Sequence, residues 1–383
     1  MARKIHYPSG DVPGKAGEAG EVEVSTRSSS GEREAGQNAK NLAPELVADP
    51  PQYVEPPSAD QQLRQRPGVK LGLALGGGAA RGWAHIGALQ ALKEAGIRPD
   101  IIAGTSIGAV VGGCYAADRL DELTEFALQL TPARVLALLD VHVGSGLISG
   151  DRLGRRLTEN LEGLLIEKLP LRFAAIATEF NTGHEIWLTR GSLINALRAS
   201  YALPGIFDPR RIGGRWLMDG ALVNPVPVTA ARALGAEIVV AVNLSGAGYG
   251  RGTVIQDFGS DAEPGTEANG VAAEQERGLL SPVREAASRM RDLFRRRRGT
   301  PGFAQVMIDA FNITQDRITR ARLAGDPPDV IASPQLSEIG LFEFHRAAAI
   351  IAAGRESVLR ALPQVHEVME LAERSFLARQ RTP

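Results

Sequence analysis

Cysteine and long apolar runs are scarce in this chain of 383 residues. Cys114 is the single cysteine, so the chain forms no disulfide within itself and suits a reducing compartment. No stretch of about 18 apolar residues, the minimum for a membrane-spanning helix, occurs anywhere in it. The first residues, Met1 to His6, lack the apolar segment of a secretory signal peptide. These absences predict a cytoplasmic protein without a transmembrane helix.

Sequence patterns for metal and nucleic-acid binding are also missing. Paired Cys or His ligands do not occur, so we expect no metal and no other cofactor. The formal net charge is −1, which gives no general attraction to nucleic acid. Cys114 lies in a run of small residues from Gly104 to Ala117 that predicts a buried helix, where thiols are usually inert packing groups.

Composition divides the chain into three parts. Residues 1–66 are rich in Gly, Ser, Glu and Pro, and they bury too little apolar surface to offset the entropy of ordering, so we expect disorder. Residues 67–362 are predicted to form the main domain, with a core at 71–244 and a glycine-rich polar insertion at 245–300. Residues 363–383 are expected to form a helical tail.

Short apolar strands alternate with helical patterns through the core, which predicts an α/β layered fold. A hairpin is expected around Gly213–Gly214, and the Ile-Val-Val-Ala-Val run within Glu237–Leu244 suits a buried parallel strand. The other predicted strands cover residues 69–75, 101–103, 172–178 and 185–188, and the predicted helices cover 83–95, 228–234, 304–323 and 341–362.

The segment Gly104-Thr105-Ser106-Ile107-Gly108 lies directly between a predicted strand and a predicted helix. A serine on such a sharp turn has its hydroxyl lifted clear of the backbone, and glycines on either side prevent collisions with the strand and helix. The start of the next helix directs its dipole and free amides toward this hydroxyl. The pattern indicates a nucleophilic Ser106, although a tight turn with a capping serine has the same short sequence.

A second glycine-rich turn, Gly76-Gly77-Gly78-Ala79-Ala80-Arg81-Gly82, also ends a strand and opens a helix. Its glycines let the main chain approach a ligand closely and point several amides at one spot. In an acyl hydrolase the bound anion is the oxyanion of the tetrahedral intermediate, whereas in a dinucleotide-binding protein it is a pyrophosphate. Asp100 lies near the position expected for a ribose-binding acid. The glycines alone are compatible with both functions.

Asp219-Gly220-Ala221 follows the predicted hairpin and supplies a carboxylate beside a glycine. An isolated Asp-Gly pair is usually a turn. A base is needed for Ser106, however, and no histidine has the flanking residues of a catalytic triad; the six are His6, His85, His142, His184, His345 and His366. Asp219 is therefore the candidate base.

In this order and at this spacing, the three motifs resemble those of the patatin-like phospholipases. Gly76–Gly82 with the following Trp83–Gly87 is similar to their oxyanion loop and first helix, and Gly104–Gly108 to their nucleophile elbow. Tyr201–Phe207 resembles the segment before their hairpin, and Asp219–Ala221 their base motif. The likeness is closest to bacterial members related to the catalytic domain of neuropathy target esterase. Three ordered motifs favour the hydrolase over a dinucleotide-binding protein.

The resemblance implies a three-layer α/β/α fold with a central, mostly parallel sheet. It implies a serine esterase of phospholipase A or lysophospholipase type, acting on phospholipid or another acyl-ester lipid through a Ser–Asp dyad. A non-catalytic membrane-associated regulator with this fold and an NAD(P)-binding enzyme remain as alternatives. The implied site residues are Ser106 as nucleophile and Asp219 as proton acceptor; Gly76, Gly77, Gly78, Ala79, Arg81 and Gly82 in the oxyanion loop; Gly104, Thr105, Ile107 and Gly108 in the elbow; and Gly220 and Ala221 beside the base.

Leu279–Arg298 carries an apolar stripe at helical spacing and ends in four consecutive arginines, Arg295–Arg298. Such a helix can enter the headgroup region of an anionic membrane, or it can pack on the protein's own core with a solvated basic edge. The arginine run favours peripheral contact with an anionic membrane. No nucleic-acid partner is expected, and the sequence gives no indication of an oligomeric state.

Overall fold

A computed structural model describes residues 68–138, 140–141, 148–149, 151–158, 161–245 and 303–380 of the chain. The segment 1–66, all but the first residue of the insertion at 245–300, and the basic stretch Leu279–Arg298 lie outside the described residues. Within the described residues, every helix is too short or too polar to cross a membrane.

The main sheet has eight strands in the order β10-β9-β1-β2-β5-β8-β7, with β6 also paired to β5. The five strands from β10 to β5 run parallel, whereas β6, β7 and β8 form antiparallel pairs. The strands of the sheet are β1 (Leu71–Leu75), β2 (Ile101–Thr105), β5 (Arg172–Glu179), β6 (Glu185–Leu188), β7 (Arg210–Ile212), β8 (Arg215–Asp219), β9 (Ile238–Val242) and β10 (Val330–Ala332). A separate two-stranded sheet pairs β3 (Asp140–Val141) with β4 (Ile148–Ser149).

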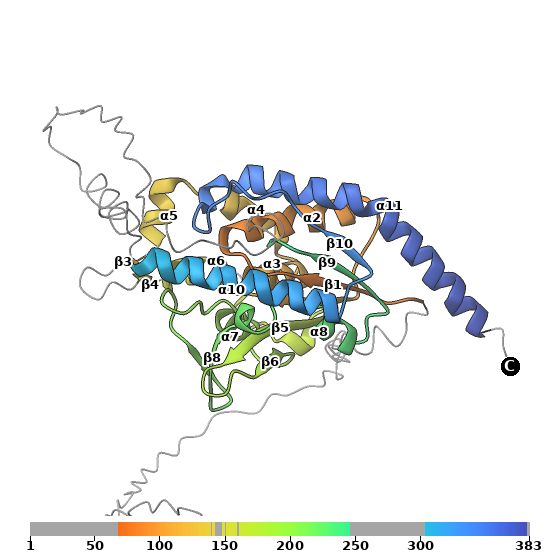
Figure 1. Cartoon of the computed structure of the whole chain (residues 1–383), viewed down its shortest axis with the longest axis horizontal. Helices are drawn as coiled ribbons and strands as arrows, with labels where there is room; N and C mark the ends of the chain where they lie inside the picture. Colours follow the sequence, from red (N-terminus) through yellow and green to blue (C-terminus); the bar gives the residue numbers. More distant parts are fainter. Residues whose placement is uncertain are drawn as a thin grey trace, which may run out of the picture. The chain divides into compact units, whose positions relative to one another are not determined.

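Helices cover both faces of the main sheet (Figure 1). The α-helices are α2 (Ala84–Glu94), α3 (Ile107–Ala116), α4 (Leu120–Leu128), α5 (Pro132–Leu138), α6 (Asp151–Thr158), α7 (Leu193–Ser200), α8 (Val228–Ala233), α10 (Phe303–Gly325) and α11 (Ala347–Gln380). The short 3-10 helices are η1 (Ala79–Trp83), η3 (Ile166–Lys168), η4 (Gly220–Leu222) and η5 (Phe344–Arg346).

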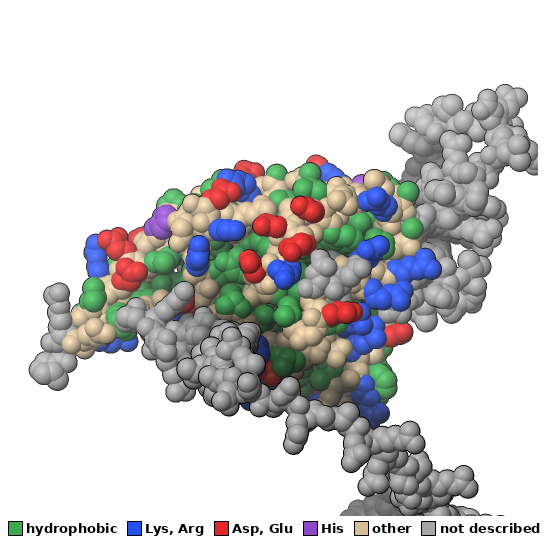
Figure 2. Space-filling view, turned by 180° about the vertical axis from the view of Figure 1, so that it is seen from behind, with side chains coloured by type: hydrophobic (Ala, Val, Ile, Leu, Met, Phe, Trp, Pro, Cys, Tyr) green, Lys and Arg blue, Asp and Glu red, His purple; other side chains and the backbone are tan. Residues whose placement is uncertain are grey.

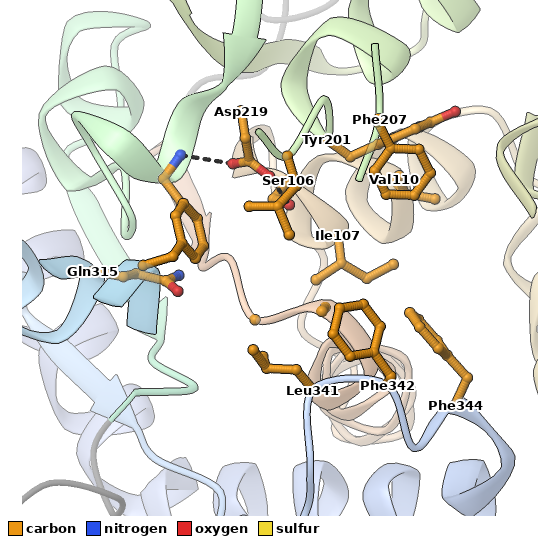
Figure 3. A pocket seen from close by; sticks show the side chains of 15 residues that line it. Ser106, Ile107, Val110, Tyr201, Phe207, Asp219, Gln315, Leu341, Phe342 and Phe344 are labelled. Atoms are coloured by element: carbon orange, nitrogen blue, oxygen red, sulfur yellow. Dashed lines mark hydrogen bonds between the residues drawn. The ribbon is translucent and has the colours of Figure 1, made fainter. Parts of the chain in front are cut away.

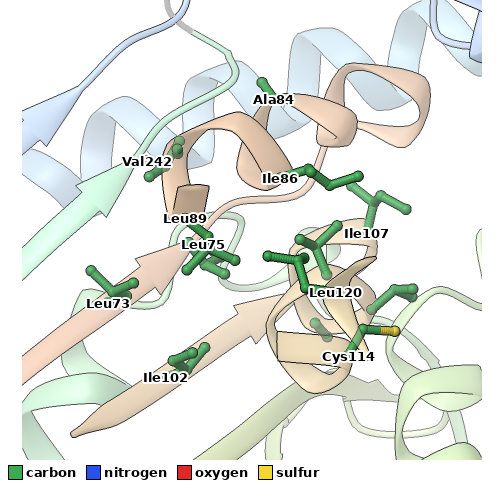
Figure 4. Close-up of a cluster of buried hydrophobic side chains, with 14 of the residues drawn as sticks. Leu73, Leu75, Ala84, Ile86, Leu89, Ile102, Ile107, Cys114, Leu120 and Val242 are labelled. Carbon is green, nitrogen blue, oxygen red and sulfur yellow. The ribbon is translucent and has the colours of Figure 1, made fainter. Parts of the chain in front are cut away.

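Alternate residues of each central strand belong to different parts of the core, because successive side chains of a strand point to opposite faces. Leu73 and Ile102 pack with α2, α3 and α11 on one face (Figure 4). Ala74 and Ala103 pack with α8 on the other face, where Leu323 of α10 also lies. Burial on both faces explains the continuous apolar strands of the sequence, and the three-layer α/β/α fold with a mostly parallel sheet is confirmed.

Helices α2 and α11 lie side by side on this first face (Figure 1). A Cβ atom on Gly87 of α2 would lie 1.9 Å from the carbonyl oxygen of Ile351, and one on Gly354 of α11 would lie 1.9 Å from that of Ala84. Neither site can hold a side chain, so the two backbones are in direct contact. An ion pair between Arg355 and Glu94 also joins the two helices.

Most elements predicted for the core are present within a few residues of the expected bounds. The hairpin turns at Gly213 and Gly214, which both have positive φ, and the strand predicted at 237–244 is β9. The sequence patterns missed β3, β4, β10 and helices α4 to α7. The predicted boundary between residues 362 and 363 falls inside α11, which continues through Pro363.

Candidate active site

The three motifs meet at the carboxyl ends of the parallel strands. The glycine loop follows β1 and Ser106 follows β2, while Asp219 is the last residue of β8. This edge is where open α/β sheets usually bind their ligands. Pairing of Ala177 with Asp219 places the end of β8 beside β5, the neighbour of β2, so Ser106 and Asp219 come from adjacent parts of the sheet.

Ser106 sits on a strained turn, with φ 56° and ψ −125°. Among the described residues only three non-glycine residues have positive φ, and two of them, Ser106 and Ala79, line the same pocket. Such conformations cost on the order of 1–3 kcal/mol and gather at functional sites. Flanking glycines are required here: a Cβ on Gly104 would lie 2.6 Å from the Ala109 nitrogen, and one on Gly108 would lie 2.2 Å from the Leu75 oxygen.

Ser106 and Asp219 lie side by side (Figure 3), and the hydroxyl of Ser106 donates a hydrogen bond to Oδ2 of Asp219 at 2.6 Å. The other carboxylate oxygen, Oδ1, accepts from the amide of Ala221 at 2.8 Å. Burial raises the pKa of Asp219 to about 7, and the hydrogen bonds from Ser106 and Ala221 only partly offset that rise. A carboxylate of this basicity is suited to accept a proton from a serine near neutral pH.

Two buried hydroxyls fix the backbone around the dyad. Ser200, the last residue of α7, accepts from the Ser106 amide at 2.9 Å and donates to the Ile176 carbonyl at 2.6 Å. Thr178 donates to the Asp219 carbonyl at 2.8 Å. A Cβ on Gly220 would lie 2.3 Å from the Ile176 oxygen, so this glycine lets the base motif pack against β5. Contacts with β5 and α7 therefore fix the positions of Ser106 and Asp219.

Only some of the amides in the oxyanion loop predicted at Gly76–Gly82 are available to bind a ligand. The amide of Gly76 donates to Val242, that of Gly77 to Pro225, and that of Arg81 to Gly78, so these three amides already have partners. The amides of Gly78 and Ala79 have no hydrogen-bond partner among the described residues, and both residues line the pocket that contains Ser106. These two are the donors available for an oxyanion. Gly82 instead leaves room for Ile107, because a Cβ there would lie 2.1 Å from Cγ2 of Ile107.

Buried and charged side chains hold the loop in place. Arg81 donates from Nε to the carbonyl of Ile339 at 2.8 Å, which agrees with a loop-fixing role for this arginine. Burial lowers the pKa of His85 to about 4, so its ring is neutral and Nε2 donates to the Gly76 carbonyl at 2.7 Å. His85 is thus a structural residue in α2.

A mainly apolar pocket opens beside the dyad. Its wall comes from α3, from the segment after α7, from α10 and from the chain between β10 and α11. The close-up shows Val110, Phe207 and Phe344 gathered on one side of Ser106, with Gln315 on the other (Figure 3). The lining residues are Gly78, Ala79, Ser106, Ile107, Val110, Tyr201, Leu203, Phe207, Asp219, Ala221, Phe311, Gln315, Leu341, Phe342 and Phe344.

Features that favoured other functions lie away from this pocket. The Asp100 carboxylate accepts from the amide of Leu71 at the start of β1, the opposite end of that strand from the glycine loop, so it cannot hold a ribose beside the loop. Burial and the nearby Glu122 raise the pKa of Cys114 to about 12, which leaves an inert thiol. The described residues contain no group of three or more His, Cys, Asp or Glu side chains placed to bind a metal.

Comparison with known proteins agrees with the motifs. The family model of patatin-like phospholipases matches residues 73–232. An NTE family protein of Mycobacterium tuberculosis is 33% identical over 349 residues, which cover 80% of this chain and 95% of that protein. The chain belongs to the patatin-like phospholipase family. Membership supports lipid acyl hydrolase activity in general.

More distant proteins share smaller regions or lower similarity. Patatin-like phospholipase domain-containing protein 6 of Mus musculus is 34% identical over 186 residues, which are 46% of this chain and 14% of that protein. The crystal structure of VipD from Legionella pneumophila matches 77% of this chain and 66% of its own at 12% identity, with a TM-score of 0.36.

Several residues near Ser106 belong to no sequence motif and were not predicted. Ser200 directly precedes the Tyr201–Phe207 segment, and a buried serine at the end of an apolar helix was the available signal. Asn224 accepts from the Thr105 hydroxyl through its carbonyl and donates from Nδ2 to Glu185, which ties the elbow to β6. Gln315 comes from α10, more than 200 residues after Ser106, and nothing in the local sequence links the two.

Proposed function

We propose that the protein is a serine lipid acyl hydrolase that cleaves ester bonds with Ser106 and Asp219 through an acyl-enzyme. One observation carries the proposal: a strained serine donates a 2.6 Å hydrogen bond to a buried carboxylate whose pKa lies near 7. The apolar pocket beside it suits an acyl chain.

In the first step Oγ of Ser106 attacks the ester carbonyl carbon, and its proton passes to Oδ2 of Asp219. The carbonyl oxygen becomes an oxyanion, which the amides of Gly78 and Ala79 stabilise, since neither has a partner among the described residues. Each such donor supplies about 3 kcal/mol of transition-state stabilisation in related sites. The amides need no reorganisation, because hydrogen bonds of Gly76, Gly77 and Arg81 already hold the loop.

Collapse of the tetrahedral intermediate breaks the bond to the alcohol, and Asp219 returns its proton to the leaving oxygen. A water molecule then attacks the acyl-enzyme, Asp219 accepts one proton from it, and the fatty acid leaves as Ser106 recovers its hydroxyl proton. Both half-reactions use one carboxyl group alternately as base and acid, which a pKa near 7 permits.

The pocket and the family together support a class of substrate. Phenylalanines and aliphatic side chains surround the proposed site of attack, which suits a hydrocarbon acyl chain. We propose phospholipid or lysophospholipid esters as substrates, hydrolysed in the manner of a phospholipase A or lysophospholipase.

A fluorophosphonate probe tests the assignment, because it phosphonylates only an activated serine. The full chain is treated with the probe, and mass spectrometry of its peptides locates the adduct. We expect labelling at Ser106, none in Ser106→Ala, and hydrolysis of lysophospholipid by the unlabelled wild type alone. A protein that neither reacts with the probe nor cleaves any lipid in an ester panel would be a non-catalytic member of the fold.

A further inference from the structure

One polar side chain in the pocket has no role in the mechanism above. Gln315 of α10 lines the pocket, and only 4% of its surface is exposed. Its side-chain nitrogen Nε2 is buried and has no hydrogen-bond partner among the described residues. A buried amide donor without a partner opposes folding, since it has lost its hydrogen bonds to water. Such a group calls for an explanation in function.

The amide of Gln315 lies against the glycine loop, close to Ser106. A Cβ built on Gly77 would lie 2.9 Å from Nε2 of Gln315, 3.3 Å from Cβ of Ala221 and 3.5 Å from Cβ of Ser106. The side chains of Gln315 and Ser106 therefore border the same small space, beside the base motif. Helix α10 packs on η4, the turn that begins directly after Asp219.

Ion pairs and hydrogen bonds fix α10 relative to the nucleophile. Arg322 of α10 donates to Oε2 of Glu185 at 2.8 Å, and Oε1 of Glu185 accepts from Asn224 at 2.7 Å. The Asn224 carbonyl in turn accepts from Thr105, the residue before Ser106. This chain of contacts joins α10 to the elbow, so the position of Gln315 beside Ser106 is set by the fold.

Gln315 is a polar side chain set apart from the main apolar cluster of the pocket. Val110, Phe207 and Phe344 lie on one side of Ser106, and Gln315 lies on the other (Figure 3), although Phe311, one turn earlier in α10, also lines the pocket. An acyl chain bound among the apolar side chains leaves the alcohol part of the ester on the side of Gln315. That part of a glycerolipid carries oxygen atoms that accept hydrogen bonds, whereas a simple alkyl alcohol offers none beyond the ester itself.

We propose that Gln315 is a specificity-determining residue that donates a hydrogen bond from Nε2 to an oxygen of a polyol leaving group, such as the glycerol part of a lipid. This inference rests on the proposed function. The unfilled donor of the free protein is satisfied when a polyol ester binds. A site built around such a donor discriminates against substrates that lack the matching oxygen.

Two water-soluble esters with the same acyl chain test the proposal: glyceryl monobutyrate, which has free hydroxyls beside the ester, and ethyl butyrate, which has none. The measured quantity is the ratio of their kcat/KM values. In Gln315→Met, which keeps the length of the side chain, we expect this ratio to fall about tenfold, the effect of losing one hydrogen bond. Thermal unfolding of the variant should occur at or above the wild-type temperature, because the unpartnered donor is gone.

Thr319→Val is a matched control from the same helix. The Thr319 hydroxyl is buried and donates to the Gln315 carbonyl at 2.7 Å, so its loss should lower the unfolding temperature and leave the substrate ratio as in wild type. An unchanged ratio in Gln315→Met, or a lower unfolding temperature, would overturn the proposal and make Gln315 a packing residue. If wild type hydrolyses neither ester nor any lipid of the panel, the proposed function itself fails, and that is visible before any variant is made.

Discussion

At the scale of single residues, several features of the site destabilise the folded state. Ser106 is held at φ 56° and the Asp219 side chain is almost fully buried. Gln315 has a buried donor without a partner among the described residues. Each of these features disfavours the folded state. The proposed reaction needs the first two, and the third belongs to the proposed recognition of the leaving group. The surrounding contacts of Ser200, Thr178 and Ala221 hold the arrangement in place.

The basicity of Asp219 predicts the pH dependence of the reaction. Asp219 accepts a proton only as the carboxylate, and burial raises its pKa to about 7. We therefore expect kcat/KM on a soluble ester to rise with pH, to reach half its maximum at about pH 7, and to level off above that. A rate that is constant from about pH 5 to about pH 9 would contradict a base of this pKa.

The same raised pKa predicts a stability effect. The pKa of Asp219 is about 7 in the folded protein, against an ordinary value of 3.8, so between these values the folded chain holds a proton that the unfolded chain releases. The free energy of unfolding therefore decreases as pH rises through this interval. Above pH 7 the ionised, buried carboxylate costs on the order of 4 kcal/mol.

Asp219→Asn removes this cost, because a neutral amide does not ionise. We expect the variant to unfold at a higher temperature than wild type at about pH 8, with a smaller difference at about pH 4. Asp208→Asn changes an exposed carboxylate and is the control. Equal unfolding temperatures of Asp219→Asn and wild type at both pH values would show that ionisation of Asp219 does not destabilise the folded protein.

Some residues of the site could be predicted from the sequence, and others could not. The placement of Ser106 and Asp219 in turns at the ends of strands was predictable, because adjacent glycines mark those turns. The amides of Gly78 and Ala79 could not be singled out within the loop, since the bonds of Gly76 and Gly77 to Val242 and Pro225 depend on how distant segments pack. Gln315 and Ser200 likewise act through contacts across more than 90 residues of chain, for which a single sequence has no local signal.

At the scale of elements, the contact between α2 and α11 supports the glycine loop. Helix α2 begins directly after η1, which carries Ala79 and Arg81. Gly87 and Gly354 let the two backbones touch, and α11 also contacts η1. The C-terminal helix therefore helps to hold the first helix and the oxyanion loop that precedes it.

Gly354→Ala tests that contact. The new Cβ would lie 1.9 Å from the Ala84 oxygen and 2.7 Å from Ala84 Cα, so α11 must move away from α2. Overpacking of this kind costs about 1–3 kcal/mol, and we expect the unfolding temperature to fall by about 5 °C in differential scanning calorimetry. Gly325→Ala, at the end of α10, meets no atom within 4 Å and should melt like wild type. Similar unfolding temperatures for the two variants would contradict the close packing.

The end of α11 shows why the boundaries of some elements could not be predicted from the sequence. The sequence predicted a helix over 341–362 and a separate helical tail over 363–383, and Pro363, a residue that disfavours a helix interior, stands at that boundary. The helix instead continues through Pro363, since Val365 is buried and Val368 and Met369 pack against the same core. Strand β10 has three residues, too few for an apolar pattern, and its position depends on pairing with β9.

At the scale of the whole molecule, the described surface carries both charges. Acidic and basic side chains lie interspersed over much of the face in Figure 2, as a net charge of −1 would suggest. Contact with an anionic membrane is proposed for Leu279–Arg298, which lies outside the described residues. This contact remains a prediction from sequence.

Replacing Arg295–Arg298 with glutamine tests the membrane contact. Each basic residue near an anionic surface contributes about 1 kcal/mol, so we expect the variant to sediment far less with anionic liposomes and equally with neutral ones. A control variant removes the same charge from exposed helical positions and should sediment like wild type: Arg317, Arg360, Arg374 and Arg379 to glutamine. Equal sedimentation of all three proteins with anionic liposomes at low salt would exclude this segment as the membrane contact.

The dyad is tested most directly by kcat/KM for p-nitrophenyl butyrate in wild type, Ser106→Ala, Asp219→Asn and the double variant. Because Ser106 and Asp219 act as one unit, we predict that each single variant loses at least about 100-fold and that the double variant is scarcely worse than either. Circular dichroism establishes that each variant is folded. Retention of more than about a tenth of the wild-type rate by Asp219→Asn, or losses that multiply in the double variant, would contradict the dyad.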